Sequence, residues 1–210
     1  MTSTLKVDEL QNSLGGSGVK VGSLKHPDAS GTNVTLASDG SATINQISSS
    51  TVFPAGGTGN PISVAYLYDE RSNGSAGGSA SSGYQIRHLN TKSDPDGFVS
   101  LNTSTFRFTL GAGTYLIHWS APAYQSYSHQ SGLYNDTASS HLISGTSEYA
   151  DKDNAVANRS FGYYNHAITS NTTYYIRHFY QSAKTTNGLG VPSTSGNSEI
   201  YTYVIIYKLK

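Results

Sequence analysis

The side chains best suited to chemistry in this chain are its seven histidines, because cysteine is absent and no thiolate can act as a nucleophile or metal ligand. They are His26, His88, His118, His129, His141, His166 and His178. No two of them have the i, i+2 or i, i+4 spacing that places two ligands on one face of a strand or helix, and no HExxH motif occurs. His118 and His178 lie in segments of strand character and could meet through folding. Hydrogen-bonded strand histidines are the favoured interpretation, and we predict no metal site.

Other patterns of catalytic or metal-binding type are weak or missing. A small oxygen-rich cluster (Asp151, Asp153, Asn154, Asn158) lacks the glycine and the distal glutamate of a calcium-binding EF-hand loop, so a solvated loop is favoured. The abundant serines include no G-x-S-x-G nucleophile motif, and the Gly74–Gly83 loop is not followed by the Lys-Ser/Thr of a phosphate loop. None of the thirteen acidic residues forms a recognisable glycosidase pair. We therefore expect no enzymatic activity and no cofactor.

Binding is the function that these residues leave open. Saccharide sites combine an aromatic ring, on which sugar C–H groups pack, with amide and hydroxyl partners for the sugar hydroxyls. Two groupings have that composition: Tyr124, Tyr127, His129 and Gln130, and then Tyr163, Tyr164 and Asn165. Each grouping is equally explained by core or interface tyrosines, so both stay candidates for ligand binding.

The elements that must position these residues are short strands. Phe106, Phe108 and Leu110 alternate with polar residues, Gly111–Gly113 reverses the chain, and a strand from Thr114 to Ala121 places Tyr115, Ile117 and Trp119 on one face. Further strands are expected at 62–69, 84–89, 130–135, 140–145, 159–168, 174–181 and 201–209, and only Asp151–Asn158 has a helical pattern. Regular short strands separated by turn residues indicate an all-β sandwich or jelly roll.

Charge and hydropathy argue against two classes of partner. Thirteen basic residues match thirteen acidic ones, so the basic surplus expected of a nucleic-acid-binding protein is absent. No stretch reaches the roughly 18 apolar residues that cross a bilayer, and MTSTLKVDEL lacks the pattern of a signal peptide. We expect neither nucleic-acid binding nor membrane insertion.

The composition divides the chain near residue 58. Residues 1–58 are rich in Gly, Ser, Thr and Asn and carry a single aromatic residue, Phe53, so they hold too little apolar surface to fold alone. We interpret 1–58 as an extended attachment segment that orders against other proteins, and 59–210 as the folded domain.

The second part of the chain resembles a known family. Phe106-Arg-Phe-Thr-Leu-Gly-Ala-Gly-Thr-Tyr115 followed by Leu116-Ile-His-Trp-Ser120 resembles the F-x-x-x-x-G-x-Y strand, turn and strand of C1q/TNF-like domains. Leu133–Asn135, Gly145–Tyr149, Tyr175–His178, Gly188–Gly190, Glu199–Tyr203 and Ile206–Lys208 resemble later parts of TNF-like domains of phage fibre and structural proteins. The resemblance implies a ten-stranded jelly roll that assembles as a homotrimer, and a role in recognition or surface decoration on a virion. The family has no common active site to transfer.

The last strand is apolar on both faces. Tyr201, Tyr203, Ile205 and Tyr207 share one face, and Ile200, Val204 and Ile206 share the other. A strand of this kind is buried on both sides, which the sandwich core and a subunit interface would provide. We therefore predict that Tyr201, Tyr203, Ile205 and Tyr207 lie in the trimer interface. The alternative is a central strand of a monomeric sandwich with a tyrosine-rich surface.

The resemblance extends weakly to the start of the chain, where Thr4-Leu-Lys-Val-Asp8 resembles the first residues of phage fibre-like or decoration proteins. The function it implies is that of a trimeric bacteriophage fibre or fibre-tip protein. Such a protein is assembled in the host cytoplasm, attached to other virion proteins by residues 1–58, and contacts a host-surface glycan through its jelly roll. One alternative is a capsid decoration, cement or head-fibre protein, and a second is a small carbohydrate-active enzyme. The sequence does not distinguish tail from capsid.

Overall fold

The computed structural model describes residues 23–24, 34–36, 42–44 and 62–209. The chain divides into two units, Met1–Thr58 and Gly59–Lys210, and each is described by itself. In the first unit, β1 (Ser23–Leu24), β2 (Val34–Leu36) and β3 (Ala42–Ile44) pair as a small antiparallel sheet in that order. The rest of the predicted attachment segment lies outside the described residues.

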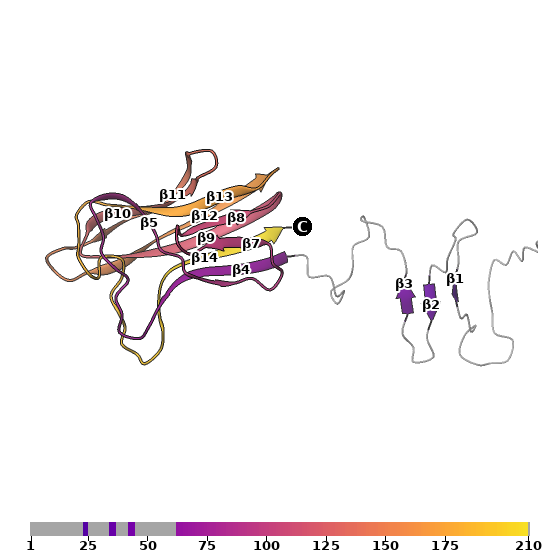
Figure 1. Cartoon of the computed structure of the whole chain (residues 1–210), viewed down its shortest axis with the longest axis horizontal. Helices are drawn as coiled ribbons and strands as arrows, with labels where there is room; N and C mark the ends of the chain where they lie inside the picture. Colours follow the sequence, from indigo (N-terminus) through magenta and orange to yellow (C-terminus); the bar gives the residue numbers. More distant parts are fainter. Residues whose placement is uncertain (1–22, 25–33, 37–41, 45–61, 210) are drawn as a thin grey trace, which may run out of the picture. The chain divides into compact units, whose positions relative to one another are not determined.

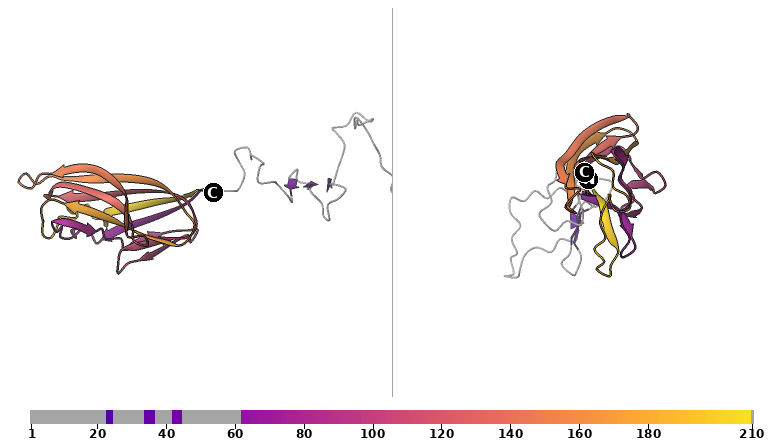
Figure 2. Two further views of the ribbon diagram at one scale, coloured as in Figure 1. Left: turned by 90° about the horizontal axis from the view of Figure 1, so that it is seen from above. Right: turned by 90° about the vertical axis from the view of Figure 1, so that its left-hand side faces the viewer.

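The second unit consists of two antiparallel sheets that face each other (Figure 1, Figure 2). The five-stranded sheet has the order β12-β9-β14-β4-β6, with β4 (Ile62–Arg71), β6 (Thr91–Ser93), β9 (Gly113–Tyr124), β12 (Ala157–Ile168) and β14 (Glu199–Leu209). The six-stranded sheet has the order β11-β10-β13-β8-β7, and β5 pairs with β13. Its strands are β5 (Gly83–Ile86), β7 (Val99–Asn102), β8 (Arg107–Leu110), β10 (Tyr127–Asn135), β11 (Ser140–Ala150) and β13 (Thr172–Tyr180).

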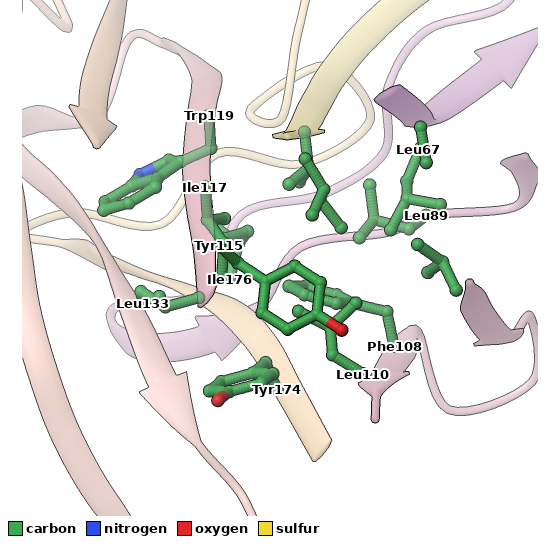
Figure 3. Packing of buried hydrophobic residues seen from close by; sticks show 14 residues of the cluster. Leu67, Leu89, Phe108, Leu110, Tyr115, Ile117, Trp119, Leu133, Tyr174 and Ile176 are labelled. Atoms are coloured by element: carbon green, nitrogen blue, oxygen red, sulfur yellow. The ribbon is translucent and has the colours of Figure 1, made fainter. Parts of the chain in front are cut away.

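The core lies between the two sheets and follows from the alternation along each strand. Tyr115, Ile117 and Trp119 of β9 point inward together, as predicted, and each is at most 1% exposed. Figure 3 shows these three side chains packed against Phe108, Leu110, Leu133, Tyr174 and Ile176 of the opposite sheet and against Leu67 and Leu89. Two packed antiparallel sheets with one shared core confirm the predicted all-β jelly-roll sandwich.

The strand count differs from the ten that the resemblance implies, since the two sheets hold six and five strands. The segment predicted as one strand at 84–89 crosses from one sheet to the other. The Arg87 amide N–H donates to Ile176 of β13, whereas the Asn90 amide N–H donates to Tyr68 of β4. Arg87 and Leu89 are therefore buried within the sandwich, and the crossing separates β5 from β6.

Two local predictions are wrong. The segment Asp151–Asn158 is not a helix: residues 151–156 form a turn between β11 and β12, and Ala157 and Asn158 begin β12. The Asp151 carboxylate accepts hydrogen bonds from the Asp153 amide and the Asn154 side chain, each at 2.8 Å. An aspartate that bonds its own following backbone stabilises such a turn. Phe106 does not belong to the strand of Phe108 and Leu110, since its φ of 59° places it in the preceding turn.

Candidate functional site

The outward side of the five-stranded sheet is aromatic and apolar. We call the outward-facing residues of β4, β9, β12 and β14 the five-strand face. At its centre Ile205 lies opposite Tyr66 on one side and His118 on the other, and Tyr163 extends this row on β12. Tyr163 is 72% exposed, Tyr66 46% and Phe161 42%, so large rings project from this face.

Three of the four residues predicted for the trimer interface lie on this face. Tyr203, Ile205 and Tyr207 are half-buried there, while Val204 and Ile206 fill the core as the other face of the strand. Tyr201 is placed elsewhere: it is only 3% exposed, and its hydroxyl donates to the Ser75 carbonyl at 2.7 Å. The cause is a register shift between Ile200 and Tyr203, which breaks the alternation that the prediction assumed.

The outward side of the six-stranded sheet combines aromatic rings with guanidinium groups. We call its residues Tyr84, Tyr134, Tyr175, Arg177 and Phe179 the six-strand face. The rings of Tyr134 and Tyr175 stack at 4.8 Å between centroids, and those of Tyr84 and Phe179 meet at 5.3 Å. The Arg177 guanidinium lies 4.4 Å from the centre of the Tyr84 ring and 5.3 Å from that of Tyr134. These contacts join β5, β10 and β13 into one ring-lined surface.

A shallow hollow of about 480 Å³ continues this surface between β10, β11 and β13. It is lined by Ser128, His129, Gln130, Ser147, Glu148, Tyr149 and Phe179. The Gln130 side-chain amide donates to the Gly145 carbonyl at 3.1 Å and to the Ser147 hydroxyl at 2.9 Å. Hydroxyls, an amide and aromatic rings therefore lie together, as a saccharide site requires.

The first predicted ligand grouping is divided by the structure. Gln130 lines the hollow, but the His129 side chain is directed inward and is only 2% exposed. Tyr127 stacks on Tyr149 at 5.8 Å and donates to Asp153, so it lies beside the hollow. Tyr124 is held beneath the Lys184 ammonium, 5.4 Å from its ring centre.

The second predicted grouping does not form one site. Tyr163 and Tyr164 are neighbours on β12 and therefore point to opposite sides of the sheet. Tyr163 belongs to the five-strand face, whereas Tyr164 packs against the core. The two side chains therefore do not share a surface.

A buried polar chain runs through the sandwich beside the apolar core. Arg87, which is fully buried, donates to the Thr202 hydroxyl, to the Pro122 and Leu189 carbonyls and, at 2.6 Å, to the Tyr180 hydroxyl. Tyr180 bonds to His178 Nδ1 at 2.8 Å, His178 Nε2 to His129 Nδ1 at 2.9 Å, and His129 Nε2 to Asn158 Oδ1 at 2.5 Å. We call these five residues (Arg87, Tyr180, His178, His129, Asn158) the polar chain.

The polar chain fixes the protonation of both histidines. A guanidinium can only donate, so the Tyr180 oxygen accepts from Arg87 and its proton is free to go to His178 Nδ1. His178 then carries its proton on Nε2, as does His129, whose Nε2–H donates to Asn158. Burial lowers the pKa of His129 and lowers that of His178 well below 6.5, and the nearby Arg87 charge lowers both further. Both imidazoles are therefore neutral at pH 7.

Sequence reasoning paired the wrong histidines. His178 meets His129, while His118 lies on the outward side of the other sheet. Arg87 was not singled out at all, because an arginine inside an alternating strand normally faces solvent. Its burial results from the crossing between the sheets, which has no local signal in the sequence.

The described residues place few groups together for catalysis or metal binding. No three His, Asp or Glu side chains in 62–209 or the three short N-terminal strands converge as metal ligands. Asp151 and Asn154 of the predicted oxygen-rich cluster bond to each other. Within the same described part of the chain, no helix is long and apolar enough to cross a membrane.

Comparison with known proteins finds solved structures of similar fold. No family model and no curated protein matches the sequence. The second unit is similar to solved TNF and C1q structures. Murine APRIL at pH 5.0 is 10% identical, with a TM-score of 0.48 over 70% of this chain and 99% of that one. The globular domain of the zebrafish complement 1qA protein is 16% identical, with a TM-score of 0.44 over 70% of this chain and 96% of that one. Eiger TNF from S. frugiperda is 13% identical, with a TM-score of 0.45 over 72% and 94%. At this identity the likeness concerns the fold alone.

Proposed function

We propose that the chain is a homotrimeric binding protein of a virion surface, which associates through the five-strand face and contacts its ligand elsewhere on the jelly roll. The observation that carries the proposal is the composition of the five-strand face. The residues of its three central rows are uncharged, and the one guanidinium of residues 62–209 that reaches them is that of Arg159 in the next row of β12, which donates to Ser120 and lies 5.7 Å from the centre of the Tyr203 ring. The three rows contain Phe161, Ser120, Tyr203, Tyr68 and Thr91, then Tyr163, His118, Ile205, Tyr66 and Ser93, then Asn165, Leu116, Tyr207 and Val64. Interface centres are depleted of charge and enriched in aromatic residues in this way.

A second copy of the chain is the occupant that fits this face best. Exposed rings such as those of Tyr163, Tyr66 and Phe161 on one face are unfavourable in water and are typical of association sites. In an assembly of closed symmetry every subunit uses the same surface for its contacts. The resemblance to C1q/TNF-like domains implies three subunits. The six-strand face carries Arg177 instead, and Arg107 contacts its Tyr175 ring, so this face remains suited to a polar ligand.

Replacing Ile205 with Asp is expected to convert the trimer into monomers, because three carboxylates would be buried at an apolar interface. Static light scattering of the full chain should give three times 22.3 kDa for the wild type and 22.3 kDa for I205D. I86D places the same change on the outward side of the six-stranded sheet and should stay trimeric. Fluorescence of Trp119, the single tryptophan, reports whether each variant is folded. A monomeric wild type, or equal dissociation of I86D, would contradict the trimer.

The virion location rests on the sequence of the first unit, namely the Thr4–Asp8 resemblance and the low apolar content of residues 1–58. We propose that this segment attaches the trimer to other virion proteins and that the domain binds rather than catalyses. Antibody labelling of purified particles should place the protein at the tail for a fibre or at the shell for a decoration protein. Adsorption of the purified trimer to host cells favours the fibre, and particle destabilisation without the protein favours decoration. Unlabelled particles would refute the location, and turnover of host polysaccharide would favour the enzyme alternative.

A further inference from the structure

We propose that the six-strand face binds a saccharide chain that bears carboxylate groups, with Arg177 as the residue that recognises the anion. This inference rests on the binding function proposed above and names the chemical class of the ligand. It concerns a surface that lies on the opposite sheet from the five-strand face.

Arg177 differs from every other arginine of the chain. Arg71 and Arg107 pair with Asp69 and Asp136, at 2.7 and 2.9 Å. Arg87 donates to hydroxyl and carbonyl oxygens, and Arg159 donates to the Ser120 hydroxyl and the Tyr201 carbonyl. Within residues 62–209, the Arg177 guanidinium contacts the Tyr84 and Tyr134 rings, and no oxygen accepts a hydrogen bond from it. Its donors are therefore available to a ligand.

The surroundings hold this guanidinium in place. Tyrosine rings on two neighbouring strands contact it, and cation–π contacts of this kind restrict the orientation of the guanidinium. The cross-strand neighbours of Arg177 are Ile86 on β5 and Gly132 on β10, and the His141 imidazole lies over Gly132. Neither Ile86 nor Gly132 has an oxygen in its side chain that could accept from the guanidinium. A planar fork of N–H donors matches a carboxylate with two parallel hydrogen bonds, and a fork that is already oriented loses less entropy when it binds.

The rest of the surface suits a sugar. The Tyr84 ring is 62% exposed and offers an open ring for the C–H face of a pyranose. The Gln130 amide uses its N–H donors within the protein, which leaves its carbonyl oxygen as an acceptor for a sugar hydroxyl. Glu148, which lines the hollow, repels anions. We therefore place a carboxylate at Arg177 and an uncharged part of the chain in the hollow.

The test is binding of the full-length trimer to acidic oligosaccharides by isothermal titration calorimetry. The probes are oligogalacturonate, hyaluronan oligosaccharides and oligosialic acid, each compared with the same oligosaccharide after its carboxylates are reduced to alcohols. At least one acidic probe should bind, and its reduced form should bind about 10-fold or more weakly, because a charge-assisted bidentate contact is lost. R177Q should weaken binding of the acidic probe to about the same extent.

K208Q is the matched control, since Lys208 of β14 also stacks on a ring, that of Phe98, but belongs to the five-stranded sheet. It should bind like the wild type. Static light scattering that gives the wild-type mass for R177Q and K208Q verifies that both variants assemble. Binding of none of the three acidic probes, equal binding of their reduced forms, unchanged binding by R177Q, or equally strong competition by inorganic phosphate would overturn the inference. If this inference fails but neutral saccharides bind, or the protein still adsorbs to host cells, the proposed binding function stands. If neither occurs, the proposed binding function fails as well.

Discussion

Lowering the pH from 7 to 5 is expected to remove a large share of the stability of the β-sandwich, because the polar chain holds His129 and His178 neutral. Their pKa values are lowered by burial and by the Arg87 charge, whereas the unfolded chain protonates them near pH 6.5. Protonating His178 would place a second cation beside Arg87 and would make Nδ1 a donor toward a tyrosine oxygen whose own proton then has no acceptor. The folded protein therefore binds protons at His129 and His178 more weakly than the unfolded chain does.

The direction of the effect follows from proton linkage. Above pH 6.5 neither the folded nor the unfolded chain protonates these histidines, so their contribution to stability is fully present. As the pH falls from 6.5 toward the lowered folded-state pKa values, only the unfolded chain gains protons, and stability is lost. Each histidine that stays neutral costs about 1.4 kcal/mol per pH unit in this window. A loss of this kind is large beside the total of about 5–15 kcal/mol for a typical domain, and His178, whose pKa is lowered well below 6.5, contributes the larger part.

Urea unfolding at pH 7.5, 6.5, 5.5 and 5.0, followed by the fluorescence of the buried Trp119, measures this dependence. H178Q and H129Q should each be less stable than the wild type at pH 7.5, yet their stability should fall less steeply below pH 6.5, by about one proton each. The two variants serve as controls for each other. A wild-type free energy of unfolding that is constant from pH 7.5 to 5.0 would refute the proposed role of the polar chain.

The strands of the sandwich are predictable from the sequence where the side chains alternate and the strand faces water on one side. The run from Thr114 to Ala121 is an example, because Tyr115, Ile117 and Trp119 meet both conditions and are all buried. The sequence does not predict the positions at which one backbone hydrogen bond or one extra residue changes the side of the sheet to which a side chain points. Tyr201 was assigned to the outward side because strict alternation was assumed, and the register shift before Tyr203 has no sequence signal.

The candidate surfaces depend on pairing between strands distant in sequence, and for this reason they were predicted only in part. Gln130 was identified by residue type, but Phe179 and Tyr84 join its row only through the pairing of β10, β13 and β5. The sequence does not mark Arg177 as a binding residue, because a single arginine in a strand is common. It stands out only when the hydrogen-bond partners of the other arginines are known. Tyr163 and Tyr164 were grouped by proximity in sequence, although a strand separates adjacent side chains by the full thickness of the sheet.

Substituting Gly162 with Ala is expected to destabilise the domain by about 3 kcal/mol, because β12 leaves room at this position for the indole ring of the opposite strand. Gly162 pairs with Trp119 across β12 and β9, and a Cβ at Gly162 would lie 2.0 Å from Trp119 Cζ2. The ring has little freedom to retreat. It is fully buried, and its Nε1–H donates to the Ser131 hydroxyl at 2.9 Å, which in turn bonds to the Ser160 hydroxyl at 2.7 Å.

Differential scanning calorimetry of the full chain should show the melting temperature of G162A lowered by about 10 °C. G111A is the matched control, because a Cβ there would meet only the Asn171 side chain at 3.6 Å, an ordinary contact. Its melting temperature should stay close to that of the wild type. Gly162 lies between Phe161 and Tyr163, which are both exposed on the five-strand face, so a displaced β12 should also weaken the trimer. A G162A variant that melts with the wild type would mean that the indole can move aside, and the five-strand face would then be less rigidly supported than we infer.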